Sequence, residues 1–199
     1  MTARLVVLIS GNGSNLQAIL EACSSGELDA KVVSVISNKA DAYGLVRAKN
    51  VGVPAIYFAK QENESRHGYD TRLAAYVSTC LPDYAILAGW MRILSSSFLS
   101  LFPNRVINLH PALPEMFPGL HAIERAFEAY QRGDIKQTGV MVHLVPDEGV
   151  DNGPVLGQQE IDFQQNESLE QFESRVHEVE HKLLVETLKN ILVESKRST

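Results

Sequence analysis

The residues best suited to chemistry lie between Val106 and Pro111, in the sequence VINLHP. Branched apolar residues alternate here with polar ones, so an extended backbone would place Asn108 and His110 on one face of a strand. An amide donor would then stand beside a titratable imidazole. Pro111 ends the strand, and further prolines before residue 120 keep the following loop out of regular structure. Open α/β sheets place their chemistry at such strand ends. A capped strand with a hydrogen-bonded surface histidine is the alternative.

A glycine-rich turn, GNGSN at 11–15, follows the first apolar run of the chain, RLVVLIS at 4–10. The run is typical of a strand buried on both faces of a parallel sheet, and the apolar residues after the turn have helical spacing. Strand, turn and helix together offer free backbone N–H groups and the positive end of a helix dipole, which suit a phosphate. Asn12 or Ser14 is expected to cap the helix.

The turn differs from the two common nucleotide-binding loops. A dinucleotide fingerprint needs a third glycine where Leu16 stands, and a nucleoside triphosphate loop needs Gly-Lys followed by Ser or Thr. The second predicted strand, residues 31–37, ends in Asn38 and Lys39 without the acid that holds the ribose of NAD. We therefore expect a phosphate but no NAD, with a purely structural turn as the alternative.

Strands and helices alternate along the chain, which predicts right-handed βαβ units. Further strands are expected at 55–58, 84–88, 105–109, 138–145 and 155–163, and helices at 43–50, 69–80, 121–130 and from 168 onward. The fold class is therefore α/β: an open, mostly parallel twisted sheet of about seven strands with helices on both faces, a Rossmann-like N-terminal half and a long C-terminal helix. Residues 1–199 are expected to form a single domain, with a phosphate-binding half at about 1–105 and a catalytic half at about 106–199.

Two loops could complete the site at the strand end. The apolar loop GWMRIL at 89–94 could sandwich a flat heterocycle, although Trp90 and Met91 could equally cover the core. The loop PDEGVDNGP at 146–154 holds three acids, and acids in turns are usually solvated or capping. An acid fixed near His110 would instead raise the pKa of the imidazole and hold its orientation.

Other histidines lie in apolar surroundings. His143 falls within an apolar strand, which is more typical of a satisfied core histidine than of a catalyst. The last helix opens with a capping-box match, SLEQ at 168–171, and contains HEVEH at 177–181, which fits the HExxH pattern of zinc proteases. The apolar stripe from Val176 to Leu183 indicates a face packed on the sheet, so we prefer packing over zinc.

Composition limits the class of protein. The chain has 199 residues and a net charge of −6, which argues against a nucleic-acid surface. Its apolar runs are too short for a membrane span or a signal peptide, so a cytoplasmic protein without a membrane partner is expected. Cys23 and Cys80 are isolated in predicted helices, where small buried hydrophobes in a reducing compartment are the expectation.

Four motifs occur together in order: GNGSNL at 11–16, AGWMRIL at 88–94, NLHP at 108–111 and DNGP at 151–154. With them the sequence resembles the phosphoribosylglycinamide formyltransferase family, folate-dependent enzymes of de novo purine synthesis, over about residues 4–192. The Asn-x-His pair with an acid is shared by enzymes that act on 10-formyltetrahydrofolate. The glycine-rich turn and the length favour this family over the tRNA formyltransferases and the formyltetrahydrofolate deformylases, which carry an additional domain.

The resemblance implies a role for each matching position. The catalytic residues would be Asn108, His110 and Asp151. The substrate phosphate would bind the N–H groups of Gly13, Ser14 and Asn15, and the ribose hydroxyls would bind Glu180. Gly89 and Gly119 would let the backbone approach the glycinamide arm. The folate would be held by Arg66, Met91, Arg92, Ile93 and Leu94, with Asn108 and the loop that reaches Asp151.

The implied reaction moves a formyl group from 10-formyltetrahydrofolate to the amine of glycinamide ribonucleotide. Asn108 would donate an N–H to the tetrahedral oxyanion, and a cationic His110, kept protonated by Asp151, would donate another. Neither a metal nor NAD is implied, and the oligomeric state stays open between a monomer and a homodimer. Alternatives are transfer to water or to another sugar-phosphate amine, a phosphate-binding regulatory module without turnover, and the zinc protease.

Two segments depart from the family pattern. The loop after His110 reads PALPEMFPG, where the family usually has Pro-Ser-Leu-Leu-Pro and then a basic or small residue, so Glu115 changes the charge of the loop. The segment 129–136 is a few residues longer than is usual in the family, which indicates a surface extension.

Overall fold

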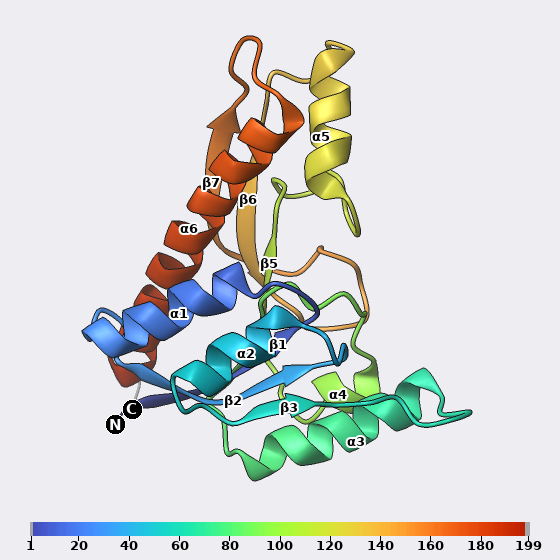
Figure 1. Ribbon diagram of the computed structural model, residues 1–199, viewed down its shortest axis with the longest axis vertical. Helices are drawn as coiled ribbons and strands as arrows, with labels where there is room; N and C mark the ends of the chain where they lie inside the picture. Colours follow the sequence, from blue (N-terminus) through green and yellow to red (C-terminus); the bar gives the residue numbers. More distant parts are fainter. Residues whose placement is uncertain (1, 198–199) are drawn as a thin grey trace.

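Residues 2–197 are described by the computed structural model, in which seven strands form one sheet in the order β3-β2-β1-β4-β5-β6-β7 (Figure 1). The strands are β1 (Ala3–Ile9), β2 (Ala30–Ser37), β3 (Ala55–Tyr57), β4 (Tyr84–Leu87), β5 (Val106–His110), β6 (Gln137–Leu144) and β7 (Val155–Asp162). The helices are α1 (Ser14–Ser25), α2 (Tyr43–Asn50), α3 (Arg66–Thr79), α4 (Ser96–Leu99), α5 (Ala122–Gln131) and α6 (Leu169–Arg197). Strands β1 to β5 are parallel, and β6 and β7 are antiparallel additions. The predicted α/β class and mostly parallel sheet are confirmed.

Strand β1 lies at the centre of the sheet. All its residues from Leu5 to Ile9 are buried, because it pairs with β2 on one side and β4 on the other and is covered on both faces. The chain runs outward through β2 and β3 and then returns to β4. This reversal between β1 and β4 is the switch point at which open α/β sheets bind ligands. The loops that follow these two strands meet there, since Ser10 N donates to Gly89 O at 2.9 Å.

Helices cover both faces of the sheet. One buried cluster joins the sheet to α1, α2, α5 and α6, and the other joins it to α3 and α4. Figure 1 shows α1 and α2 on the opposite side of the sheet from α3. The sheet is thereby a rigid platform, and its loops are free to form a site.

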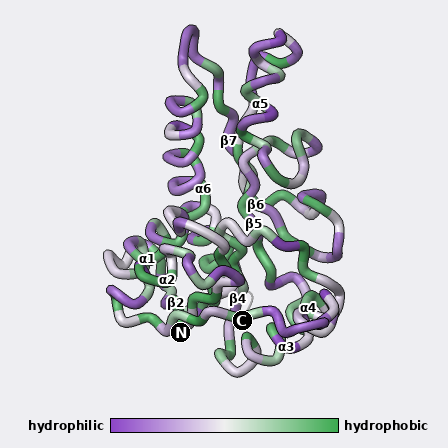
Figure 2. Tube along the Cα trace, turned by 45° about the vertical axis from the view of Figure 1, so that its right-hand side comes forward, coloured by the Kyte–Doolittle hydropathy of each residue, from purple (hydrophilic) through white to green (hydrophobic). Residues whose placement is uncertain are grey.

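An arm extends from the sheet, made of α5, the outer parts of β6 and β7, and the start of α6 (Figure 1). Stacked aromatic rings hold it together, with 4.2 Å between the ring centroids of Tyr130 and Phe163. The predicted capping box at its helix start is confirmed, because Ser168 N donates to Gln171 Oε1 at 2.9 Å and Gln171 N donates to Ser168 Oγ at 3.2 Å. The outer end of the arm is hydrophilic in Figure 2.

Two local expectations were wrong, and one short helix was missed. Neither Asn12 nor Ser14 caps α1: Gly13 is the N-cap in a left-handed conformation with no side-chain cap, and Ser14 already belongs to the helix. The short helix α4 has no signal in the apolar pattern. Cys23 and Cys80 are only partly buried, each packed against one of the two core clusters, and burial raises the pKa of Cys23 to about 11.

Candidate active site

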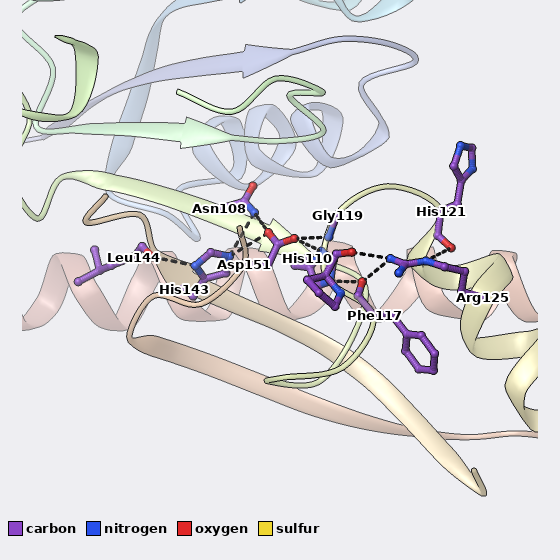
Figure 3. Close-up of polar contacts among 10 residues, drawn as sticks. Asn108, His110, Phe117, Gly119, His121, Arg125, His143, Leu144 and Asp151 are labelled. Atoms are coloured by element: carbon purple, nitrogen blue, oxygen red, sulfur yellow. Dashed lines mark hydrogen bonds and ion pairs between the residues drawn. The ribbon is translucent and has the colours of Figure 1, made fainter. Parts of the chain in front are cut away.

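Three side chains from two remote segments meet at the carboxyl end of β5. Asn108 and His110 project from the same face of this strand, and both reach Asp151 of the loop after β6 (Figure 3). Asn108 Nδ2 donates to Asp151 Oδ1 at 3.0 Å, and His110 Nδ1 lies 3.2 Å from Asp151 Oδ2. The predicted alternation of β5 therefore brings the pair together with an acid that is more than forty residues away in the sequence.

Asp151 is held in an ionised state. Its backbone has a φ of 51°, a left-handed conformation that is strained for a residue with a side chain. Burial by itself would raise the pKa of this carboxyl. Hydrogen bonds from His143 and from Gly119 N, the latter at 2.8 Å, and the nearby imidazoles outweigh burial and lower the pKa below its usual value. A carboxylate is thus available beside the imidazole at neutral pH.

The environment of His110 overturns one expectation. Its ring is almost fully buried, and burial lowers the pKa of the imidazole more than Asp151 and the Phe117 carbonyl raise it. Asp151 raises the pKa as expected, but the net shift is downward and the expected cationic His110 was wrong, because a sequence pattern reveals the acid but not the loss of water around the ring. His110 Nε2 lies 3.1 Å from Phe117 O, so each ring nitrogen faces an acceptor.

His143 belongs to the same cluster. It is buried as a core histidine would be, but its Nε2 lies 3.2 Å from Asn108 Nδ2 and 3.5 Å from Asp151 Oδ1. The antiparallel pairing of β5 with β6 places His143 directly opposite Asn108. Sequence reasoning missed this residue, although it is a single imidazole in an otherwise apolar strand, because the register of two strands is not visible in either one.

The Pro111–Gly119 loop closes over the imidazole. Arg125 of α5 holds it by donating to Phe117 O at 2.6 Å and to Pro118 O at 2.7 Å. Glu115 and Phe117 both have positive φ values, so the backbone of the loop is strained. Glu115 is exposed and lies outside the cluster of acids and histidines. The departure of this loop from the family pattern thus changes the cover of the site rather than Asn108, His110 and Asp151.

The glycine-rich turn lies at the switch point and meets the last helix. Gly13, Ser14 and Asn15 form the N-terminus of α1, and Asn15 Nδ2 donates to Glu180 Oε2 at 3.3 Å. Glu180 is buried, and its hydrogen bond to His177 Nδ1 raises the pKa of that imidazole. The buried Asn15 Oδ1 has no hydrogen-bond partner among the described residues. The backbone N–H groups at the start of α1 are therefore available to a phosphorylated ligand, whereas Asn15 Oδ1 can only accept a hydrogen bond.

Arg47 of α2 supports this turn and was not found from the sequence. Its Nε donates to Asn12 O at 3.0 Å, and its Nη2 donates to Asn12 Oδ1 at 2.8 Å. The helix comes close because Gly44 packs on Gly13: a Cβ on Gly13 would lie 2.8 Å from Gly44 Cα. An arginine 35 residues along the chain thereby fixes the turn and adds positive charge beside it.

The HExxH-like stretch forms ordinary side-chain contacts. His177 pairs with Glu180, and burial lowers the pKa of His181. Within residues 2–197 no three His, Cys, Asp or Glu side chains are grouped closely enough to hold a metal ion. The apolar side of this helix packs on the sheet, as expected, with Val176 and Leu183 buried.

The loop after β4 offers an apolar surface. Met91 and Ile93 are exposed, with 59% and 45% of their surface accessible, while Trp90 and Leu94 cover the core. Gly89 has a φ of 82°, which lets the backbone turn outward at the end of β4. The predicted alternative for Trp90, a core role, is therefore the one observed.

Arg92 of this loop and Arg66 at the start of α3 both make side-chain contacts with neighbouring elements. The guanidinium of Arg92 lies 4.3 Å from the centroid of the Tyr69 ring. Arg66 forms an ion pair with Glu148, whose Oε1 also accepts from Ser96 N at 2.8 Å. The loop that carries Asp151 is thus tied to the starts of α3 and α4.

The open α/β sheet, with its Asn-x-His strand end facing an aspartate, has the kind of site that is found in one class of enzymes, the transferases. The family model described as formyl transferase matches residues 3–188, so the chain belongs to the formyl transferase family. Within residues 2–197, no helix combines the length and hydropathy needed to span a membrane.

The individual relatives include proteins named phosphoribosylglycinamide formyltransferase. Those of Schizosaccharomyces pombe and Escherichia coli are 44% and 42% identical, covering 98% and 89% of this chain and 100% and 81% of their own. The solved phosphoribosylglycinamide formyltransferase of Bacillus halodurans has a TM-score of 0.89 at 32% identity, covering 96% of both chains. Glycinamide ribonucleotide transformylase 1 of Symbiobacterium toebii has a TM-score of 0.88 at 39% identity, covering 94% of this chain and 86% of its own.

Proposed function

We propose that this protein transfers the formyl group of 10-formyltetrahydrofolate to the amine of glycinamide ribonucleotide, in de novo purine synthesis. Similarity to the named relatives over nearly the whole chain supports this reaction. The observation that carries it is the convergence of Asn108, His110 and Asp151 at one strand end, between a phosphate-binding turn and an apolar loop. A sugar phosphate bound at the turn and a flat ring bound at the apolar loop would then meet at one carbon, the formyl carbon.

The reaction proceeds through one tetrahedral intermediate. The amine lone pair forms a bond to the formyl carbon, and the carbonyl π pair moves to oxygen. When that pair returns, the bond between the formyl carbon and the folate nitrogen breaks. The amine must lose one proton and the folate nitrogen must gain one, so a group that takes up and returns a proton is required.

His110 fits this proton transfer because its pKa is lowered. A neutral imidazole accepts a proton from the attacking amine, and the resulting cation then has N–H donors on both nitrogens. Their partners, Asp151 Oδ2 and Phe117 O, are both acceptors, so the cation is stabilised once it forms. Its charge also stabilises the oxyanion beside it. Because both ring nitrogens face acceptors of the protein, one of these contacts must be exchanged for the substrate before His110 takes the amine proton and passes it to the folate nitrogen.

The remaining residues bind the two substrates. The N–H groups of Gly13, Ser14 and Asn15 take the phosphate, and Glu180 accepts hydrogen bonds from the ribose hydroxyls. The pteridine lies against the loop after β4, supported by the exposed Met91 and Ile93. The other members of the folate site are Arg66, Arg92 and Leu94, and Gly89 and Gly119 border the glycinamide arm.

We also propose that residues 1–199 act as one domain in the cytoplasm, as a monomer or a homodimer. The continuous sheet supports a single unit, since the phosphate-binding half at about 1–105 and the catalytic half at about 106–199 share it through the pairing of β4 with β5. Transfer requires no metal and no NAD in this scheme.

A direct assay tests the proposal. Purified protein is given 10-formyltetrahydrofolate with and without glycinamide ribonucleotide, and tetrahydrofolate release and formylated product are measured. Product should form at the rate of tetrahydrofolate release, and Asn108→Ala or His110→Ala should lower kcat by about two to three orders of magnitude. Tetrahydrofolate release at the same rate without glycinamide ribonucleotide would mean that the formyl group is transferred to water. A fully active His110→Ala enzyme, or ligand binding without turnover, would overturn the proposal.

A further inference from the structure

The apolar loop after β4 is held by the protein at its two ends and is open in its middle. Met91 N donates to Ser10 Oγ at 2.8 Å, and Ser95 N donates to Asp70 Oδ2 at 2.7 Å. Between these contacts, the backbone N–H and C=O groups of residues 92–94 make no hydrogen bond within the described part of the chain. A ligand that lies against the loop therefore meets backbone groups whose position depends on the two end contacts.

Asp70 is a buried acid to which the proposed reaction gives no role. It lies on α3 and has no exposed surface. Burial of an acid costs free energy unless hydrogen bonds compensate for the lost water, and acids are rarely buried completely. One oxygen of Asp70 accepts from Ser95 N, whereas Oδ1 has no partner among residues 2–197. The contact with Ser95 N is thus the feature that requires an acceptor at this position.

The residue before Asp70 supports the same loop. The guanidinium of Arg92 lies over the ring of Tyr69, whose hydroxyl donates to Phe58 O at 2.9 Å. Trp90 and Leu94 of the loop pack in the same apolar cluster as Tyr69. Consecutive residues of α3 therefore contact the middle and the end of the loop, so this helix sets the position of the loop.

We propose that Asp70 is a positioning residue for the folate, which accepts from Ser95 N and so fixes the backbone of residues 92–94 before the flat ring binds. This inference rests on the proposed function. Without the acceptor, the Ser95 N–H would be buried without a partner, which favours a displaced loop. Folate binding would then have to order the loop, and affinity for the folate would fall. The glycine-rich turn has separate support from Arg47, so binding of glycinamide ribonucleotide should not change.

Steady-state kinetics of two variants test this assignment. Asp70→Leu keeps the branched shape and removes the acceptor, whereas Asp70→Asn keeps an oxygen that can accept from Ser95 N. Asp70→Leu should raise the KM for the folate by about tenfold or more and leave kcat and the KM for glycinamide ribonucleotide within about twofold. Asp70→Asn should keep the folate KM within about threefold of wild type, because the hydrogen bond can still form.

Val77→Ala is the control for a general loss of stability. Val77 is fully buried on the same helix, about two turns beyond Asp70, and its truncation should lower the melting temperature without changing either KM. Melting temperatures show whether each variant folds. If Asp70→Leu does not fold, Asp70→Ala removes the acceptor without adding an apolar branch and carries the same expectation.

Trp90 reports the position of the loop directly, because it is the only tryptophan of the chain and its side chain is buried. Its fluorescence emission should move to longer wavelength in Asp70→Leu and should stay at the wild-type wavelength in Val77→Ala. Quenching of this emission by added tetrahydrofolate gives a Kd without turnover. That Kd should rise in Asp70→Leu by about tenfold, as the folate KM does.

The outcomes are distinct. A folate KM in Asp70→Leu within about twofold of wild type, equal rises in both KM values, the same rise in Val77→Ala, or an equal loss in the Asn and Leu variants would overturn the inference while wild-type transfer continues. Absence of formyl transfer in the wild-type protein would overturn the proposed function instead, and the tetrahydrofolate titration would still test Asp70.

Discussion

The two ends of the site are built differently. The proposed phosphate-binding turn is formed by consecutive residues, Gly11 to Asn15, and leaves the backbone N–H groups at the start of α1 open. The proposed catalytic cluster comes from separate segments and is closed: both oxygens of Asp151 and both nitrogens of His110 are paired within the protein. A ligand phosphate can enter the turn without rearrangement, whereas the reacting groups must exchange partners when substrate arrives.

Backbone strain also differs between the turn and the cluster. The turn uses Gly13 for its left-handed residue, where glycine has no steric cost. The segments around the catalytic cluster use Glu115, Phe117 and Asp151 in that region, each at a cost of about 1–3 kcal/mol. The strain makes it easier for these segments to change their contacts. The cluster can therefore open when substrate arrives.

The largest effect should come from Asp151→Asn, which keeps the shape of the cluster and removes its charge. The imidazolium of His110 would lose its ionic partner, so we expect kcat to fall by about 10³-fold or more with little change in either KM. Steady-state kinetics at saturating substrates provide the measurement. Glu124→Gln, at an exposed contact with His121, is the control and should retain full activity. A similar loss there, or a kcat within tenfold in Asp151→Asn, would contradict the assignment.

Gly13→Ala should affect binding instead. A Cβ would meet the backbone of Gly44 at 2.8 Å and would be strained at a φ of 75°, so the turn must shift. We expect a stability loss of about 1–3 kcal/mol and a KM for glycinamide ribonucleotide raised by about tenfold, with the folate KM unchanged. Gly26→Ala is the matched control, since Gly26 has a φ of 79° with no neighbour within 4 Å. It should lose stability without any change in KM.

The contrast between a contiguous turn and a cluster assembled from separate segments also explains what could be predicted from the sequence. Asn108 and His110 were found because two residues on a strand have a fixed relation, and the glycine-rich turn was found because it is contiguous. His143 and Arg47 were missed because their contacts depend on the β5–β6 register and on the position of α2, which only the assembled core defines. The pKa of His110 was misjudged because desolvation depends on the complete cover of the ring.

Acid pH should change the contributions of the two ends of the site to folding stability in opposite directions. The pKa of His110 is lowered by burial, so the unfolded chain binds the proton first and this residue destabilises the fold as pH falls below 6.5. The pKa of His177 is raised by Glu180, so its stabilisation is complete below 6.5 and is lost as pH rises through the folded value. The lowered pKa of Asp151 adds stability that persists until pH approaches 3.8.

Urea denaturation between pH 4.5 and 8 measures these contributions. Relative to wild type, His110→Gln should lose less stability on acidification, and His177→Gln should lose more. Shifts of the same sign in the two variants would contradict the opposite environments. The groups that face His110 are Asp151 and His143, and both remain in each variant.

The smallest effect should come from the contact that ties the Asp151 loop to the starts of α3 and α4, beside the proposed folate site. Glu148→Gln keeps an oxygen that accepts from Ser96 N but removes the charge paired with Arg66. Both side chains are well exposed, so the pair is weak, and a freed Arg66 should lower the KM for the folate by about two- to threefold with kcat unchanged. Kinetics at low salt and at 1 M salt provide the test, because screening removes the difference at high salt. Asp147→Asn, in the same loop, should leave the folate KM unchanged. A raised KM in Glu148→Gln would instead mean that the ion pair holds the Asp151 loop in its binding position, and that the folate side is as closed as the catalytic cluster.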